Sequence, residues 1–341
     1  MKPLTRARWL RTIAGFFLLW LGVQVGGALI GPQSIDLGRA LGGATGPDRD
    51  ILFAIRVPRD LLAALVGGAL AVSGVVFQAV LRNPLASPYV LGVSAGGTLG
   101  AVLTIHLGLA SALPGVPTIP AAAFLGCLLS IALVFAIARQ AGMAPRHTLL
   151  LSGVIVNACF SAVVLFITYV ASPEDTVRIV RWLMGGIGWE PYSTIAGVAA
   201  VLVPGAALTL RFAGSLNLLS LGEEGARSLG VAVERTRNLL FLLVSLLTGI
   251  SVAVTGPIGF VGLIVPHLLR LVLGPDHRVL LPVAFLAGGA FLTLADSLAR
   301  TLLSWTSAQP REIPVGVLTA LLGGPFFVLL LRRHFQRSYF D

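Results

Sequence analysis

Two stretches without a formally charged residue limit what this chain can fold into: residues 83–138 and residues 238–269. A membrane-spanning helix needs roughly 20 apolar residues, within a range of about 17 to 25, so each stretch is too long for a single span. Prolines between positions 114 and 120 divide the first stretch, because proline interrupts the hydrogen-bond ladder of a helix. The Gly256-Pro257 pair marks a corner in the second. The chain is therefore predicted to be an all-α, polytopic membrane protein.

The composition excludes most other classes of protein. The sequence is 56% hydrophobic and 11% charged, whereas a soluble domain has about 25% charged residues. The net charge of +10 does not indicate nucleic-acid binding, because the positive residues are spread between apolar runs. Cys127 and Cys159 both lie in apolar runs, so we interpret them as buried thiols and expect neither a disulfide nor a metal site.

Ten stretches have the length and composition of membrane spans. They cover residues 10–30, 60–81, 90–109, 119–138, 148–171, 192–210, 238–255, 257–273, 279–299 and 313–331. The basic N-terminus imitates a secretory signal, but the uncharged stretch from Thr12 to Ile35 is too long and lacks a clean cleavage site. We interpret it as a retained first span. In the third span Gly92, Gly96 and Gly100 repeat at four-residue spacing, which favours close packing between helices.

The distribution of Lys and Arg orients these spans, because cytoplasmic loops carry an excess of both. With the N-terminus in the cytoplasm, the inner segments hold 16 of the 24 basic residues and the outer segments hold 8. Merging residues 238–273 into one span would place Arg332, Arg333 and Arg337 outside. The prediction is one transmembrane domain, residues 1–341, with ten spans and both termini in the cytoplasm.

The chain has a single lysine, Lys2. A Walker-A loop requires a glycine-rich turn that ends in Lys beside Ser or Thr, so this chain cannot contain one. We therefore expect no enzyme here. If ATP drives the process, a separate ATPase chain binds and hydrolyses it.

The longest inner loop, residues 211–237, contains the sequence LLSLGEEGARSLGV. Ser220 followed by Glu223 matches a capping box, and Gly230 is a typical C-terminal stop. These signals predict a helix of about two turns, acidic at its start and carrying Arg227 near its end, as the helix dipole favours. So short a helix is marginal in water. It is either a solvated surface helix or a contact for a partner protein.

Arginines on the predicted outer face run against the charge trend. Arg56 and Arg59 start the second span, and Arg300 lies near the end of the ninth. One interpretation is that they bind lipid phosphate or pair with Asp60 and Asp296, the latter one turn from Arg300. The other is that they receive an acidic partner from outside, since the guanidinium fork suits carboxylates.

Segment 172–191 has two possible interpretations, and His267 is given no functional role. The outer segment 172–191 is either a short lid helix at the mouth of a pathway or an interfacial loop with Trp182 and Trp189 in the aromatic belt. Its Met184-Gly185-Gly186 run suits a bend. His267 has no second titratable neighbour within its span, so we interpret it as structural.

Several segments together resemble one family. RVPRDLLAALVGGALAVSGVVFQAVLRNPLASPYVLGVSAGG, SLGEEGARSLGV, GPIGFVGLIVPHLLR, DHRVLLPVAFLAGGAFLTLADSLAR and EIPVGVLTALLGGPFF are similar to collinear motifs of the BtuC/FecCD-like permeases. The resemblance covers residues 10–335. These permeases are the membrane subunits of type II ABC importers for iron-siderophores, haem and cobalamin.

The resemblance implies a fold and a set of partners. The family has ten spans per subunit, and two permeases form a homodimer around a path lined largely by spans five and ten. Two ATPase subunits, which bind ATP-Mg, dock on the inner face, and a substrate-binding protein docks outside. The location implied is the bacterial inner membrane. No cofactor or metal is expected on this chain itself.

The resemblance also implies site residues. It assigns ATPase coupling to a segment of about residues 213–232, docking of the binding protein to three arginines, and the cytoplasmic gate to two neighbouring loops. The coupling residues are Ser220, Glu223, Glu224, Ala226, Arg227, Leu229 and Gly230. The docking residues are Arg56, Arg59 and Arg300. The gate residues are Asn83, Pro84 and Leu85 in one loop and Arg146 in the neighbouring loop, residues 144–147.

Two other classes compete with this interpretation. A secondary, ion-coupled transporter without an ATPase partner predicts inverted halves and a buried ion site, for which the spans offer Asp296 alone. An intramembrane enzyme needs converging acid, base or metal ligands, and no such cluster is visible in the spans. The cargo stays open among siderophore, haem and cobalamin, because the shared motifs serve partners and packing.

Overall fold

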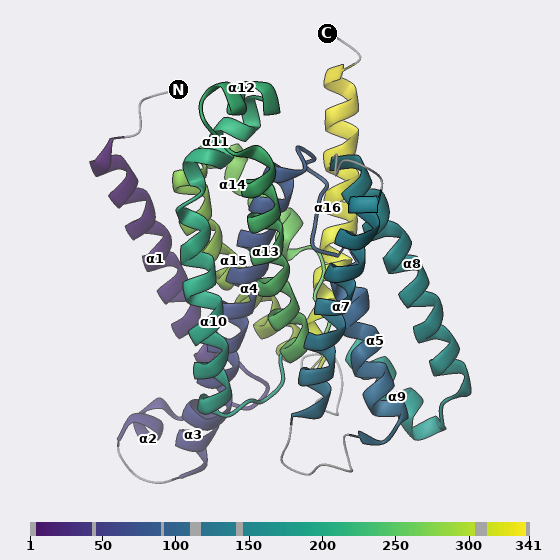
Figure 1. Ribbon diagram of the computed structural model, residues 1–341. Coiled ribbons are helices and arrows are strands. Elements are labelled where there is room, and N and C mark those ends of the chain that lie inside the picture. Colours follow the sequence, from purple (N-terminus) through teal and green to yellow (C-terminus); the bar gives the residue numbers. More distant parts are fainter. Residues whose placement is uncertain are drawn as a thin grey trace.

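The computed structural model describes residues 5–42, 46–89, 92–109, 117–140, 146–303 and 312–338, with 139–140, 146–147 and 329–338 described by their backbone alone. Within these ranges every regular element is a helix, as the all-α prediction requires (Figure 1). A helix overlaps each of the ten predicted spans. These helices are α1 (Arg6–Leu29), α4 (Val57–Val80), α5 (Val93–His106), α7 (Thr118–Gln140), α8 (Arg146–Val170), α10 (Tyr192–Leu210), α13 (Val233–Thr255), α14 (Val261–Leu273), α15 (His277–Thr301) and α16 (Val315–Ser338).

Not all of these helices have the length and apolar composition of a membrane span. Among the described residues seven do: α1, the continuous helical run from Pro47 to Val80, α7, α8, α10, α13 and α15. Helices α5, α14 and the Val315–Val328 part of α16 are shorter. The multi-pass membrane fold is therefore confirmed, and the count of ten crossings stays a prediction.

Short helices lie at the two ends of the bundle. On one side are α2 (Leu37–Leu41), α3 (Pro47–Asp50), the π-helix η1 (Ile51–Arg56) that leads into α4, and α9 (Pro173–Leu183). On the other side are α11 (Ala213–Leu221) and α12 (Glu223–Ser228), together with the start of α1 and the end of α16 (Figure 1).

The centre of the bundle is α4, most of whose side chains are buried. Glycines allow its backbone to touch two neighbours. A Cβ atom on Gly67 would lie 2.3 Å from the carbonyl oxygen of Gly288 in α15, and one on Gly74 would lie 1.8 Å from that of Gly262 in α14. Small residues are the means by which helices approach closely in lipid, where no hydrophobic force drives them together.

The glycine repeat of the third span has the predicted packing role. Cβ atoms on Gly96 and Gly100 of α5 would lie 2.2 and 2.1 Å from carbonyl oxygens of α7, at Gly126 and Ala122. Gly92 has φ of +77° and forms the N-cap of α5, a conformation that other residues rarely adopt.

Large apolar side chains cover the periphery. On α8, Leu165, Phe166 and Tyr169 are exposed, Tyr169 by 88%, as expected for a surface that meets lipid or another chain. The expectation for the cysteines is half right: both thiols are free, and Cys127 is buried, but Cys159 is exposed. An apolar run of sequence does not show which of its side chains face the core, and Cys159 lies on the outward face of α8.

The contact between α4 and α14 generates a test of the packing. We expect Gly74→Ala to lower the thermal stability of the purified protein, because overpacking typically costs about 1–3 kcal/mol and the obstructing atom belongs to the backbone. Gly197→Ala in α10 is the control, since no atom lies within 4 Å of its Cβ position. That variant should be neutral or slightly stabilising. Equal melting temperatures for the two variants in detergent would contradict the close approach.

Candidate functional site

A cluster of charged side chains lies where the start of α4 meets the end of α15. The Arg59 guanidinium forms two parallel hydrogen bonds to the Asp296 carboxylate, at 2.9 and 3.0 Å. Arg300 pairs with Asp60 at 2.7 Å and with Asp296 at 3.2 Å. The side chains of Asp60, Asp296 and Arg300 are each no more than 3% exposed. Charges so deeply buried require partners, and here each finds one on the facing helix.

Two more contacts extend this cluster. Arg59 also pairs with the half-exposed Glu312 at 2.7 Å, which holds the segment leading into α16. Arg56 is buried and donates hydrogen bonds to backbone carbonyls at the end of α1, those of Ala28, Leu29 and Gln33. We call Arg56, Arg59, Asp60, Asp296, Arg300 and Glu312 the outer ion cluster. It ties together α1, α4, α15 and the start of α16.

Pairing within the chain, one of the two interpretations of these arginines, is confirmed for Arg59 and Arg300. A role in docking a binding protein stays a prediction for Arg56, Arg59 and Arg300. Arg59 is the most accessible of the three, because its side chain is 14% exposed and its partner Glu312 lies at the surface.

The predicted coupling segment forms two helices, where one was expected. Ser220 lies inside α11 and its hydroxyl donates to the carbonyl of Leu216 within that helix, so the predicted capping box is wrong. The chain turns at Gly222, whose φ of +130° is open to glycine and strained for other residues. Gly230, with φ of +85°, follows the end of α12 as predicted.

The side chains of α12 divide between the bundle and the outside. Ala226 is buried, and Glu223 lies 3.7 Å from Arg237, which is 8% exposed in α13. Glu224 and Arg227 are exposed, and so are Leu221 and Leu229, by 73% and 62%. The ATPase-coupling role stays a prediction, but the structure separates an inward residue, Glu223, from this exposed face.

The predicted gate residues lie in two places: Asn83, Pro84 and Leu85 come shortly after the end of α4, and Arg146 lies at the start of α8. Asn83 accepts a hydrogen bond from the amide of Leu85 through its side chain, which shapes the turn that contains Pro84. Arg146 is the first residue of α8, and its side chain lies outside the described residues, as do residues 144 and 145. The structure does not bring these two loops into a described contact, so the gate remains a prediction.

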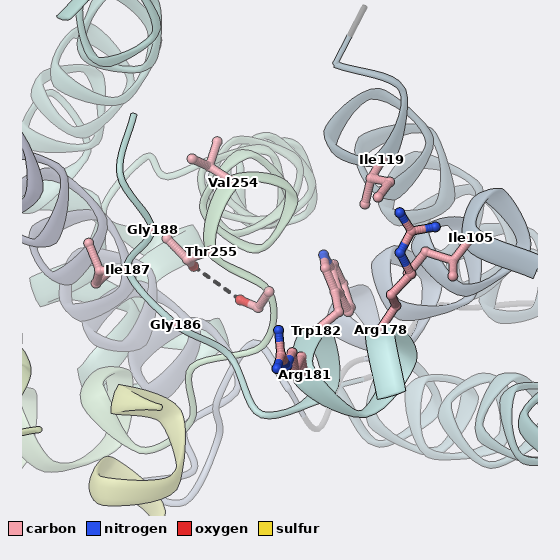
Figure 2. Close-up of a pocket in the computed structure, with 11 residues that line it drawn as sticks. Ile105, Ile119, Arg178, Arg181, Trp182, Gly186, Ile187, Gly188, Val254 and Thr255 are labelled. Atoms are coloured by element: carbon pink, nitrogen blue, oxygen red, sulfur yellow. Dashed lines mark hydrogen bonds between the residues drawn. The ribbon is translucent and has the colours of Figure 1, made fainter. Parts of the chain in front are cut away.

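Segment 172–191 begins as a helix, α9. Together with the ends of α5, α7 and α13, it lines a cavity of about 440 Å³ (Figure 2). Ser172 caps α9 by accepting from the amide of Asp175. The predicted bend is present at Gly185, with φ of +63°. A hydrogen bond of 2.8 Å from the Gly186 amide to the carbonyl of Thr255 joins the segment to α13.

The lining of this cavity is apolar with two positive side chains. Trp182, Ile105 and Ile119 form apolar walls, while Arg178 and Arg181 project from α9 (Figure 2). Arg178 lies 4.0 Å from Asp175; for Arg181 no ion pair occurs within the described part of the chain. Among the described residues that line the cavity, none is acidic. A mostly apolar pocket with a few directed polar groups is typical of a small-molecule site, here one that favours an anion.

The sequence interpretation missed these two arginines as lining residues, although the amphipathic pattern of residues 173–183 could have placed them on one face of a helix. It also missed Glu312 as a partner, for which no local signal exists. In the part of the chain that the structure describes, no group of three or more His, Cys, Asp or Glu side chains could hold a metal ion.

Comparisons with known proteins agree on one family. The model of the FecCD transport family matches residues 15–333. The hemin transport system permease protein HmuU of Yersinia pestis is 41% identical over 334 residues, covering 96% of this chain and 98% of that protein. The cobalamin import system permease protein BtuC of Halobacterium salinarum is 46% identical over 284 residues, covering 83% and 73%.

A solved structure shows the same fold. It is an ABC transporter of the metal-chelate type in an inward-facing conformation, 33% identical, with a TM-score of 0.83 over 95% of this chain and 99% of that one.

The outer ion cluster generates a stability test. We expect Asp60→Ala to destabilise the protein by about 3–5 kcal/mol, the usual effect of removing one partner from a buried ion pair. Glu312→Gln removes a half-exposed charge of the same cluster and should cost no more than about 1 kcal/mol. Combining Asp60→Asn with Arg300→Gln should recover part of the loss. Thermal unfolding in detergent measures all three, and similar midpoints for Asp60→Ala and Glu312→Gln would contradict the burial of the pair.

Proposed function

Because this chain belongs to the FecCD transport family, we propose that it is the transmembrane permease subunit of an ATP-binding-cassette importer that brings a metal chelate into the cytoplasm. The observation that carries the proposal is the end-to-end match to permeases of import systems, over residues 15–333 in the family model and 96% of the chain in the hemin permease. A secondary transporter remains the alternative class, and nothing in the comparisons favours it.

The proposed topology has ten crossings, with both termini and the α11–α12 pair in the cytoplasm of a bacterial inner membrane. Three arrangements support it. The start of α1 and the end of α16 lie on one side of the bundle, which suits an even number of crossings (Figure 1). Helices α11 and α12 lie on that same side, to which the predicted topology assigns 16 of the 24 basic residues.

The proposed partners fit separate surfaces. The exposed side of the α11–α12 pair, with Leu221, Glu224 and Leu229, suits the docking of one ATPase subunit, which would bind ATP-Mg. The exposed apolar side chains of α8 suit a second permease copy in a homodimer. On the opposite side, Arg59 and Glu312 offer surface charge to a substrate-binding protein.

The cavity beside α9 supports a proposal about the cargo. Helix α9, which lines this cavity, lies on the side of the bundle opposite α11 and α12 (Figure 1), where cargo would arrive. Its two arginines and its apolar walls match an apolar or aromatic chelate that carries carboxylates or other anionic oxygens. The choice among siderophore, haem and cobalamin is not resolved by this chemistry.

Purification and transport together test the proposed function. An affinity-tagged chain expressed in its own host should bring an ABC ATPase with it, identified by mass spectrometry. The complex in liposomes should accumulate a ferric chelate, haem or cobalamin when ATP and the matching binding protein are present. It should not do so when the ATPase carries a Walker-A substitution. Uptake driven by a proton or sodium gradient without ATP would overturn the proposal in favour of the secondary transporter.

The exposed face of α12 generates a docking prediction. We expect Glu224→Arg to weaken association with the ATPase about tenfold, or about 1.4 kcal/mol, because it reverses an exposed charge at the centre of the proposed contact. Glu174→Arg at the start of α9 is the matched control: the same change at an exposed first-turn residue on the other side of the bundle. ATPase recovery per permease measures both. Equal recovery would remove Glu224 from the contact.

The cavity generates a second prediction. We expect Arg181→Glu to raise the KM for uptake of an anionic chelate such as ferric citrate by about tenfold, with a smaller effect on a neutral ferric hydroxamate. The reason is that charge reversal repels the anion and leaves the apolar walls intact. Arg39→Glu, a highly exposed arginine in α2, is the control and should leave both KM values unchanged. An equal change for both chelates would contradict charge recognition at this cavity.

A further inference from the structure

Asn217 makes three polar contacts between α11 and the first residues of α15. Its Nδ2 donates to the Asp276 carboxylate at 2.8 Å. Its Oδ1 accepts from the backbone amide of His277 at 2.9 Å and lies 2.7 Å from Nδ1 of the same histidine. Asp276 is the N-cap of α15, accepting from the amide of Arg278. One side chain of α11 therefore occupies the N-terminus of the neighbouring helix.

The chemistry of this contact fits an amide and little else. A carboxylate cannot donate, so Nδ2 must face Asp276; Oδ1 must then accept from His277, whose Nδ1 carries the hydrogen. The hydrogen bonds of Arg278, and after them that of Asn217, lower the pKa of the Asp276 carboxyl to about 2. Asp276 is thus ionised at neutral pH. An acidic residue at position 217 would meet a second negative charge within hydrogen-bond distance.

Helix α15 leads from this contact to the outer ion cluster. Asp296 and Arg300 lie about five to six turns beyond His277, or roughly 30 Å at 1.5 Å per residue, which is about the thickness of the hydrocarbon core of a membrane. Over this length α15 is held against α4 by backbone contact at Gly67 and Gly288. A displacement of the start of α15 would therefore be passed to α4 through this contact, and to the outer ion cluster, which both helices share.

Helix α11 packs against both α15 and α4, and α12 packs against α13. Asn217 supplies the side-chain hydrogen bonds that join α11 to α15, and Glu223 joins α12 to α13 through Arg237. Both α15 and α4 carry charges of the outer ion cluster. On the same side of the bundle, the hydroxyl of Thr12 in α1 donates to the carbonyl of Arg8 within its own helix.

From this geometry we infer that Asn217 is a positioning residue of the transport cycle, which transmits movement of the ATPase-facing helices to α15 and so to the outer end of the pathway. This inference rests on the proposed function. A purely structural role would make Asn217 matter for folding. A transmitting role makes it matter for the number of ATP molecules used per cargo molecule.

The test uses the complete complex of permease, ATPase and binding protein in liposomes. The variants are Asn217→Ala, Asn217→Asp, the reciprocal exchange Asn217→Asp with Asp276→Asn, and Thr12→Ala in α1 as the control. We expect Asn217→Asp to lower cargo uptake per ATP hydrolysed about fivefold or more, the lower end of a typical coupling free energy. Asn217→Ala should act in the same direction. Basal ATPase activity and ATPase recovery should stay near wild type.

The reciprocal exchange separates transmission from folding. It restores one amide and one carboxylate with the donor and acceptor reversed, so uptake per ATP should return to within about twofold of wild type. Thr12→Ala, which removes one hydrogen bond within α1, should match wild type. Wild-type uptake per ATP in Asn217→Asp, failure of the exchange to restore it, or loss of the ATPase from Asn217→Ala would each overturn the inference. Failure of the proposed function would look different: the wild-type complex itself would show no ATP-dependent uptake.

Discussion

The backbone contact of α4 with α15 and α14 is the constraint on which the rest of this bundle depends. In lipid, apolar side chains gain little by leaving their surroundings, so helices associate where small residues let backbones touch. Gly67, Gly74, Gly262 and Gly288 supply that contact. Because a carbonyl oxygen, and not a flexible side chain, occupies the space beside each glycine, these helices have little freedom to slide. The bundle thus has a stiff centre, and adaptable contacts are left to its ends and its exposed outer helices.

The two ends of this stiff centre carry different kinds of polar contact. At the outer end, Asp60, Asp296 and Arg300 are buried, and breaking such pairs is expensive because it strands a charge away from water. At the other end, Asn217 accepts an uncharged hydrogen bond from the His277 amide, of a type that contributes about 0.5–1.5 kcal/mol, and donates one to the ionised Asp276 carboxylate, of a type that contributes about 1.5–3 kcal/mol. The outer contact suits a permanent joint between helices. The Asp276 side chain is 29% exposed and keeps its pair with Arg278, so breaking the Asn217 contact strands no buried charge and costs less than breaking the pairs at the opposite end.

Sequence reasoning located the helices well and their partners poorly. The length of an apolar run and the position of a proline are local properties of the sequence, so every predicted span overlaps a helix. The bend at Gly185 was likewise predicted from the Met184-Gly185-Gly186 run. Pairing is not local: Asp60 and Arg300 are 240 residues apart, and Asn217 lies inside the apolar run SLNLL, where nothing marks it. The capping box at Ser220 failed for a related reason. Its pattern is compatible with a helix start, but the backbone turns at Gly222 because glycine alone reaches that φ without strain.

The turn at Gly222 separates two helices, α11 and α12, that have different contacts. Helix α12 presents Glu224, Arg227 and Leu229 to the outside, while α11 is buried along Leu216 and Leu219 and reaches α15 through Asn217. Helix α12 is connected to α11 through Gly222 and to α13 through the contact of Glu223 with Arg237. A movement of α12 would follow one of these two routes. The first route ends in the stiff α4–α15 pair and the second in α13, which packs against both α4 and α10. If an ATPase moves α12 as proposed, the movement reaches α15 through Asn217 and reaches α4 through α11 and α13. Both α15 and α4 carry charges of the outer ion cluster, so the two routes meet there.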